Sequence, residues 1–180
     1  PSFMIYYFWG VTMKEIKTTT IYNENILKKF LEVHYFESMK TVRIILNILI
    51  LVVIINFFTK DQVKTIDIIT FIFVVLGILE VNTGIIPKVN YKRLLKKKDS
   101  VFNTKLTYTF KKNNFELIND KKEYIDYNTL KKVIEVEESY YLYINNTRAL
   151  IVDKTNLETK DIEVLTNIFK EKVSTYKYIK

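Results

Sequence analysis

The chain has 180 residues, with 28 basic and 20 acidic side chains, one His and no Cys. The lack of Cys excludes a disulfide scaffold, a Cys-based metal site and a thiol nucleophile, and 3 Gly and 2 Pro are too few for a collagen-like or low-complexity chain. At this length we expect one soluble domain, or a small domain with a membrane anchor.

Residues 1–12 do not resemble an ordinary amino terminus. They begin with Pro and contain neither a basic residue nor a small-residue cleavage site, so a secretory signal peptide is not expected. We expect this stretch to be non-native or a misassigned start, with translation beginning at Met13. The alternative is that the aromatic residues around Trp9 lie at a membrane interface.

Residues 13–40 are expected to form a cytoplasmic strand and an amphipathic helix. The Thr-rich stretch 17–22 favours a β-strand, and Asn23 is a candidate N-cap for the helix that follows. Apolar residues then recur at helical spacing as far as His34. His34 is the chain's one His and has no second ligand near it in the sequence, so it does not indicate a metal site.

Two apolar blocks follow, at residues 41–59 and 66–86. As helices they would be roughly 28 and 31 Å long, close to the hydrocarbon thickness of a bilayer. Only residues 60–65 join them, and Pro87 ends the second block. The sequence therefore predicts a transmembrane helical hairpin over residues 41–87. The alternative, that both blocks are core elements of a soluble fold, is uncommon for two adjacent runs of this length.

Three polar side chains lie inside these blocks: Asn47, Asn56 and Glu80. The two Asn side chains could form hydrogen bonds between helices, either within the hairpin or between copies in a homo-oligomer. An acid within a span is costly and often functional. Glu80 lies near the predicted end of the hairpin, so we expect its carboxylate to reach Lys88 or the lipid headgroups.

A basic juxtamembrane strip occupies residues 88–100. Residues 88–98 carry six basic side chains and no acid, whereas residues 101–180 are nearly balanced, with 14 basic and 12 acidic groups. Because the surplus charge lies beside the membrane, it predicts contact with anionic lipids and not with nucleic acid. The expected headgroup contacts are Lys88, Lys92, Arg93, Lys96, Lys97 and Lys98.

The charges on the two sides of the hairpin also predict its orientation. Basic residues precede the first block and follow the second, whereas the connection between them carries only Lys60, Lys64 and Asp61. By the positive-inside rule, the chain is expected to be a multi-pass protein of the plasma membrane with both termini in the cytoplasm.

Residues 101–180 are expected to form the cytoplasmic domain. Alternating patterns and turn residues predict six strands, at residues 105–110, 115–119, 123–127, 130–137, 140–145 and 148–153. An apolar face from Leu157 to Val173 then predicts a helix, for which Thr159 is the candidate N-cap. The expected fold class is therefore α+β, with a bent antiparallel sheet or half-barrel closed by one carboxy-terminal helix.

Candidate sites in this domain are few. Tyr141 and Tyr143 beside Arg148 could form a ligand groove. Alternation along the strand places these two on one face and Tyr140 on the other, so the tyrosines of at least one face are expected to pack in the core. Glu135, Glu137 and Glu138 are interpreted as solvated edge charges and not as an acid/base pair. The chain has no phosphate-binding loop, nucleophile elbow or metal-ligand motif, so no catalytic residue, metal or cofactor is expected.

The run from Leu106 to Lys154 resembles the YcxB-like carboxy-terminal domain of bacterial membrane proteins. The resemblance rests on Tyr108, Phe110, Tyr127, Leu130, Val133, Glu135, Tyr141, Leu142, Tyr143, Ala149, Leu150 and Ile151. The sequence departs from the family pattern at Tyr127, where a Trp is common, and at Val152 and Asp153, which replace an Ile-Pro pair. The resemblance implies two membrane helices before a small domain similar to bacterial pleckstrin-homology-like folds. It implies architecture more than activity.

The sequence is compatible with three functional hypotheses. The preferred one is a non-enzymatic, membrane-anchored protein whose cytoplasmic domain binds anionic lipid headgroups or a protein partner. The alternatives are a small membrane immunity or resistance protein against a toxin or bacteriocin, and a lipid-modifying enzyme. The absence of any catalytic constellation in the sequence argues against the enzyme.

Overall fold

The computed structural model describes residues 14–60, 62–83, 87, 89, 91–93, 101–146 and 148–179. The predictions for residues 1–12 lie outside this set. The chain is α+β and divides into two compact units, one from residues 1–22 with 103–180 and one from residues 23–102. Among the described residues, the first unit holds the strands, one α-helix and two short 3₁₀ helices, and the second is helical.

The first sheet is antiparallel and begins with a strand from the amino-terminal region. Its order is β1 (Ile16–Ile21), β2 (Lys105–Phe110), β3 (Asn114–Ile118) and β4 (Lys122–Asp126). Ile16 lies opposite Phe110 and Ile21 opposite Lys105, so β1 pairs with β2 along its whole length. The sequence predicts this strand in a segment separate from residues 101–180, whereas the structure groups the two in one unit.

The second sheet has the order β7 (Ala149–Asp153), β6 (Ser139–Tyr143), β5 (Lys132–Glu135) and β8 (Tyr176–Tyr178). β8 pairs in parallel with β5 and has no counterpart in the sequence prediction. The six predicted strands correspond to β2–β7, but the structure divides them between two sheets, where one bent antiparallel sheet or half-barrel was expected. The short 3₁₀ helix η1 (Tyr127–Thr129) separates β4 from β5, so the chain leaves the first sheet and starts a second.

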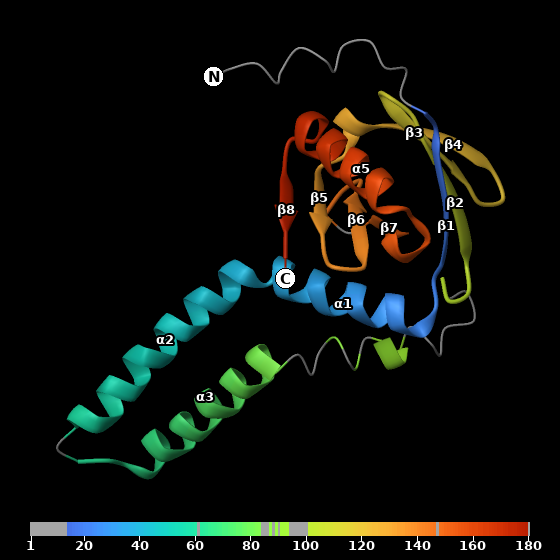
Figure 1. Cartoon of the computed structure of the whole chain (residues 1–180). Coiled ribbons are helices and arrows are strands. Elements are labelled where there is room, and N and C mark those ends of the chain that lie inside the picture. Colours follow the sequence, from blue (N-terminus) through green and yellow to red (C-terminus); the bar gives the residue numbers. More distant parts are fainter. Residues whose placement is uncertain are drawn as a thin grey trace, which may run out of the picture. The chain divides into compact units, whose positions relative to one another are not determined.

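The core of this unit is aromatic and is covered by α5 (Thr159–Lys172), which lies against the second sheet in Figure 1. Phe169 of α5 is fully buried. Its ring lies edge-on to Phe110 at 6.1 Å, to Tyr127 at 5.9 Å and to Tyr140 at 5.2 Å between centroids, and so joins both sheets. The predicted helix is confirmed, but its N-cap is Glu158 and not Thr159.

Buried hydroxyl groups connect the two sheets where β1 meets β7. The Tyr22 hydroxyl accepts a hydrogen bond from the Ile151 N–H at 2.9 Å, and the Tyr108 hydroxyl donates to the Ile151 carbonyl at 2.9 Å. Thr20 Oγ1 accepts from the Asp153 N–H at 2.9 Å. These side chains satisfy main-chain groups of β7 in place of a neighbouring strand. Burial raises the pKa of both tyrosines.

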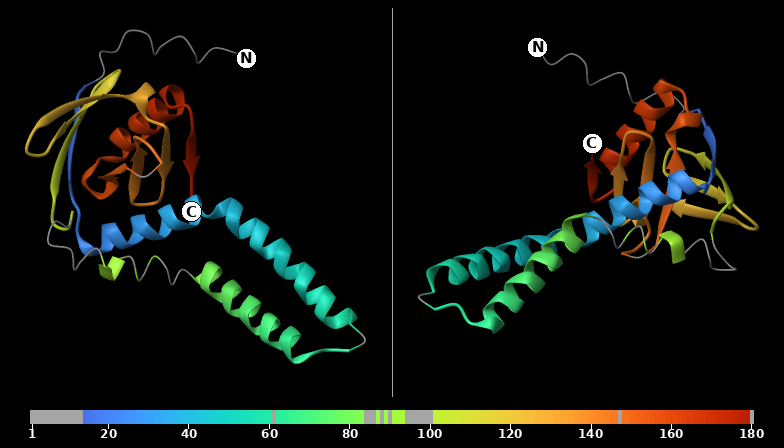
Figure 2. Two further views of the ribbon diagram at one scale, coloured as in Figure 1. Left: turned by 180° about the vertical axis from the view of Figure 1, so that it is seen from behind. Right: turned by 90° about the horizontal axis from the view of Figure 1, so that it is seen from below.

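The helical unit contains α1 (Glu24–Ser38), α2 (Lys40–Thr59) and α3 (Thr65–Thr83). The predicted cap is confirmed, because Asn23 Oδ1 accepts from the Ile26 N–H at 3.0 Å. α2 and α3 run antiparallel beside each other in both views of Figure 2. Near the connection between them, the rings of Phe57 and Phe71 stack at 4.7 Å between centroids.

Candidate membrane-facing site

The surface of α2 is apolar and uncovered. None of its residues is buried, and its large side chains are open, with Ile48 57% and Phe58 75% exposed. Within the part of the chain that the structure describes, α2 is the one helix that is long and apolar enough to cross a membrane by length and composition. Large contiguous apolar patches are rare on soluble monomers, so this surface is a candidate for contact with a membrane or with another molecule.

α3 resembles α2 in length and exposure, but it carries two acidic residues. It is 19 residues long and includes Asp67 in its first turn and Glu80 near its end. Its apolar side chains are also open to the surroundings, with Phe73 70% exposed. Asp67 forms a 2.5 Å ion pair with Lys60 and accepts a hydrogen bond from the Lys64 N–H at 3.0 Å.

A polar contact joins α2 to α3 at the end opposite their connection. Asn82 Oδ1 accepts from Arg43 Nη2 at 3.3 Å, and Asn82 Nδ2 donates to Asn47 Oδ1 at 3.5 Å. The Arg43 guanidinium also lies 4.8 Å from the centroid of the Phe36 ring. The structure thus brings Asn47 into the interhelical contact expected of it, whereas the side chain of Asn56 is exposed.

Asn82 is a site residue that the sequence analysis missed. It lies close to the end of the second apolar block, where a polar residue is expected simply because the membrane-spanning segment ends there. Its position next to Arg43 and Asn47 becomes visible only when the antiparallel register of the two helices is known.

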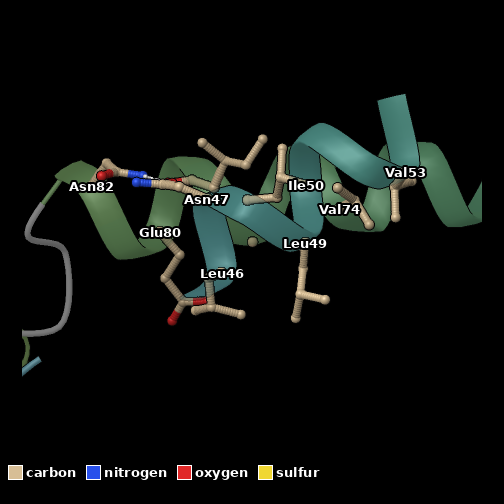
Figure 3. A pocket seen from close by; sticks show the side chains of 10 residues that line it. Leu46, Asn47, Leu49, Ile50, Val53, Val74, Glu80 and Asn82 are labelled. Atoms are coloured by element: carbon tan, nitrogen blue, oxygen red, sulfur yellow. Dashed lines mark hydrogen bonds between the residues drawn. The ribbon is translucent and has the colours of Figure 1, made fainter. Parts of the chain in front are cut away.

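A groove of about 290 Å³ runs between α2 and α3 beside this polar contact. Figure 3 shows its lining, in which Glu80, Leu46 and Leu49 extend to one side of the helix pair and Asn47 and Asn82 meet elsewhere. Among the described residues, the Glu80 carboxylate forms no hydrogen bond or ion pair. The predicted contact with Lys88 involves a residue outside the described set.

Only part of the predicted basic strip is described. Lys92 and Arg93 lie in a helical segment and are exposed, while Tyr91 beside them is buried. Lys88, Lys96, Lys97 and Lys98 lie outside the described residues. Two adjacent exposed cations are suited to contact with phosphate groups.

The tyrosines proposed for a ligand groove lie in the core. Tyr141 and Tyr143 are each 1% exposed, and every residue of strand β6 is buried. Arg148 is exposed and lies 3.8 Å from the Glu123 carboxylate. The three residues therefore do not share an open surface.

One of the three glutamates interpreted as solvated edge charges is buried, so that interpretation is wrong for Glu135. Its side chain is 9% exposed, and Oε1 lies 2.8 Å from Lys154 Nζ. The Tyr176 hydroxyl donates to Oε2, and Thr166 Oγ1 donates to the same atom at 3.3 Å. Glu137 and Glu138 are exposed, as expected.

This buried network joins elements that are distant in the sequence. Lys154 also donates to the Val136 carbonyl at 2.9 Å, and its ammonium lies 5.0 Å from the centroid of the Tyr140 ring. The Tyr140 hydroxyl in turn contacts Thr166 Oγ1 at 2.7 Å. The network fixes β5, β8 and α5 to one another, and each charged group has a partner, so its geometry is that of a structural brace.

No cluster of three or more His, Asp or Glu side chains suited to a metal ion occurs among the residues that the structure describes. Comparisons of the chain with protein-family models, curated proteins and solved structures found no match. The YcxB-like resemblance therefore stays a prediction from the sequence.

Proposed function

We propose that the chain is a membrane-anchored, non-enzymatic module. In this proposal α2 and α3 cross the plasma membrane as a hairpin, both termini are cytoplasmic, and the sheet-containing unit works at the inner membrane surface, where anionic lipid headgroups bind it. The observation that carries the proposal is the uncovered apolar surface of α2, on which no residue is buried.

The free energy of hydration supports this placement. Each Å² of apolar surface removed from water contributes about 25 cal/mol, so a helix with side chains as open as Ile48 and Phe58 is strongly stabilised by lipid. A 20-residue helix is about 30 Å long and a 19-residue helix about 28 Å, which both suit the hydrocarbon thickness. α3 joins α2 side by side and shares its exposure, which favours two spans.

The distribution of charge supports the orientation. Lys40 and Arg43 begin α2, and the exposed Lys92 and Arg93 follow α3, so four cations belong to the end of the hairpin away from its connection. In the connection, Lys60 is paired with Asp67. The positive-inside rule then favours a cytoplasmic position for the end that carries Lys40 and Arg93.

Our proposal takes the sheet-containing unit as pleckstrin-homology-like, which is what the resemblance implies. This unit has two four-stranded sheets and a carboxy-terminal helix that covers their shared core. In our proposal, Lys92 and Arg93 provide the electrostatic contact with anionic headgroups, and each such cation contributes about 1 kcal/mol near a charged leaflet.

Membrane fractionation with tags at both ends tests the proposal. We expect the protein to stay in the membrane pellet after an alkaline wash, and both tags to resist protease in intact spheroplasts. Release of the protein by the wash would contradict membrane insertion. Cleavage of one tag alone would contradict the two-span topology and leave a single span through α2.

A further inference from the structure

We propose that the groove between α2 and α3 binds one aminophospholipid, with the primary ammonium of its headgroup on Glu80 and the start of an acyl chain along the apolar part of the groove. This inference deepens the proposed function and rests on it, because the groove meets lipid only if the hairpin lies in a bilayer.

The groove has the size and lining of a small-ligand site. Its volume of about 290 Å³ is near the lower end of the usual range for ligand pockets, which begins at about 300 Å³. Apolar side chains form most of the wall, among them Leu46, Ile50, Val53, Val74 and Ile78. An alkyl chain is the ligand that such a wall accepts.

Gly77 keeps the groove open. A Cβ atom built at this position would meet no atom within 4 Å. Glycines in membrane helices commonly allow two backbones to approach closely, and a side chain would then clash with the neighbouring helix. At Gly77 the space that a side chain would fill is empty, so this glycine contributes a hollow and not a close helix contact.

Glu80 supplies charge at one end of the hollow. It lines the groove, and within the described part of the chain its carboxylate has no cationic partner. The nearby guanidinium of Arg43 is directed instead to Asn82, at 3.3 Å, and to the Phe36 ring. A ligand with a positive charge therefore complements the groove, and an anionic headgroup does not.

The position of Glu80 along the helix matches the depth of a headgroup. It precedes the last residue of α3, Thr83, by three positions, which corresponds to about 5 Å along the axis. From Leu46 to Val53 the groove continues for about 10 Å toward the membrane interior, with an apolar lining. The groove thus has one charged end near the interface and one apolar end below it, which is the polarity of a phospholipid.

The length of the groove along α2 also favours a lipid over a third helix as its occupant. A third helix, from a partner or a second copy, would need a continuous face along the 20 residues of α2, and the groove covers less than half of them. A partner helix would also have to bring its own cation to Glu80. A lipid with an ethanolamine headgroup carries both the ammonium and the chain in one molecule.

Native mass spectrometry of the full-length protein in detergent tests this site. The protein is titrated with phosphatidylethanolamine and, separately, with phosphatidylcholine of the same acyl chains, which carries the same phosphate but a quaternary ammonium without an N–H donor. We expect at least about tenfold tighter binding of phosphatidylethanolamine, since a hydrogen bond to a charged group contributes about 1.5–3 kcal/mol and each 1.4 kcal/mol is tenfold.

Two variants and two matched controls locate the binding. Glu80→Gln keeps the shape of the side chain and removes its charge, and Gly77→Leu fills the hollow; each should weaken phosphatidylethanolamine binding about tenfold or more. The control Asp67→Asn removes the other carboxylate of α3, and Leu76→Phe enlarges an exposed side chain outside the groove lining. Both controls should bind this lipid as the wild type does.

Equal affinity for the two lipids, or unchanged phosphatidylethanolamine binding in Glu80→Gln, would overturn the lipid site even if the protein stays in alkaline-washed membranes. A dimer that Gly77→Leu dissociates would instead assign the groove to a second copy and also overturn it. Release of the wild type from membranes by the alkaline wash would refute the membrane anchor itself, so the two failures are distinguishable.

Discussion

The buried ion pair between Lys154 and Glu135 allows a quantitative test of the fold. Lys154→Met keeps most of the volume and apolar length of the side chain but removes the cation 2.8 Å from Glu135 Oε1. Breaking a buried pair by removing one partner typically costs about 3–5 kcal/mol, because the remaining charge is left uncompensated. Glu135 keeps its hydrogen bonds from Tyr176 and Thr166, so we expect a loss near the lower end, about 3 kcal/mol.

The double variant Lys154→Met with Glu135→Leu separates this mechanism from a loss of packing. Replacing both members of a buried pair with apolar groups is often neutral, so the double variant should be more stable than Lys154→Met alone. Glu137→Gln serves as the matched control, because Glu137 is an exposed neighbour and should change stability by less than about 0.5 kcal/mol.

Urea unfolding of the full-length protein in mild detergent measures these changes. The reporter is the near-ultraviolet circular dichroism of the tyrosines, because five of the largest fully buried side chains are Tyr108, Tyr127, Tyr140, Tyr141 and Tyr143. A loss below about 1 kcal/mol in Lys154→Met, or a double variant no more stable than Lys154→Met alone, would refute the reasoning about an uncompensated charge.

Three further predictions follow from the same contacts. Tyr22→Phe leaves the buried Ile151 N–H without its acceptor and should cost about 1–3 kcal/mol in the same unfolding assay, whereas a loss below about 0.5 kcal/mol would contradict the role of this hydroxyl. Burial raises the pKa of Tyr140 from 10.0 to about 12. The contribution of its neutral hydroxyl to the free energy of unfolding is therefore fully present below pH 10 and is lost as the pH rises toward 12. Tyr140→Phe should reduce this alkaline loss of stability when unfolding is measured at a series of pH values. Replacing Lys92 and Arg93 together with Gln should weaken binding of the detergent-solubilised protein to phosphatidylglycerol-containing vesicles by roughly 30-fold at low salt, because each cation contributes about 1 kcal/mol. Unchanged sedimentation with these vesicles would contradict the headgroup contact.

Local patterns in the sequence predicted most of the secondary structure. The Asn23 cap, the helix that ends near Val173 and the strands β2–β7 all depend on spacing and turn residues within a few positions. The apolar run of α2 has no charged side chain from residue 44 to residue 58 and indicated a helix without a polar face. These features need no knowledge of distant parts of the chain.

The pairing of strands was not predictable in the same way. β1 and β2 face each other across a long stretch of chain, and the Thr19 and Thr107 hydroxyls that meet at 3.2 Å are 88 positions apart. The alternation of apolar and polar residues predicts a strand with two faces, but it does not predict which strand lies beside it. The division of the strands between two sheets and the parallel pairing of β8 with β5 therefore came only from the tertiary structure.

The contacts of the candidate site were likewise only partly predictable from the sequence. The sequence by itself determined which residues are apolar, which are charged and where an acid interrupts an apolar helix, because these are properties of single positions and short windows. Only the tertiary structure decided that Glu135 is buried against Lys154, that Asn82 meets Asn47, and that Gly77 faces an empty groove beside Glu80. Burial, pairing and open space depend on which segments pack against each other, and that arrangement is a property of the folded chain as a whole.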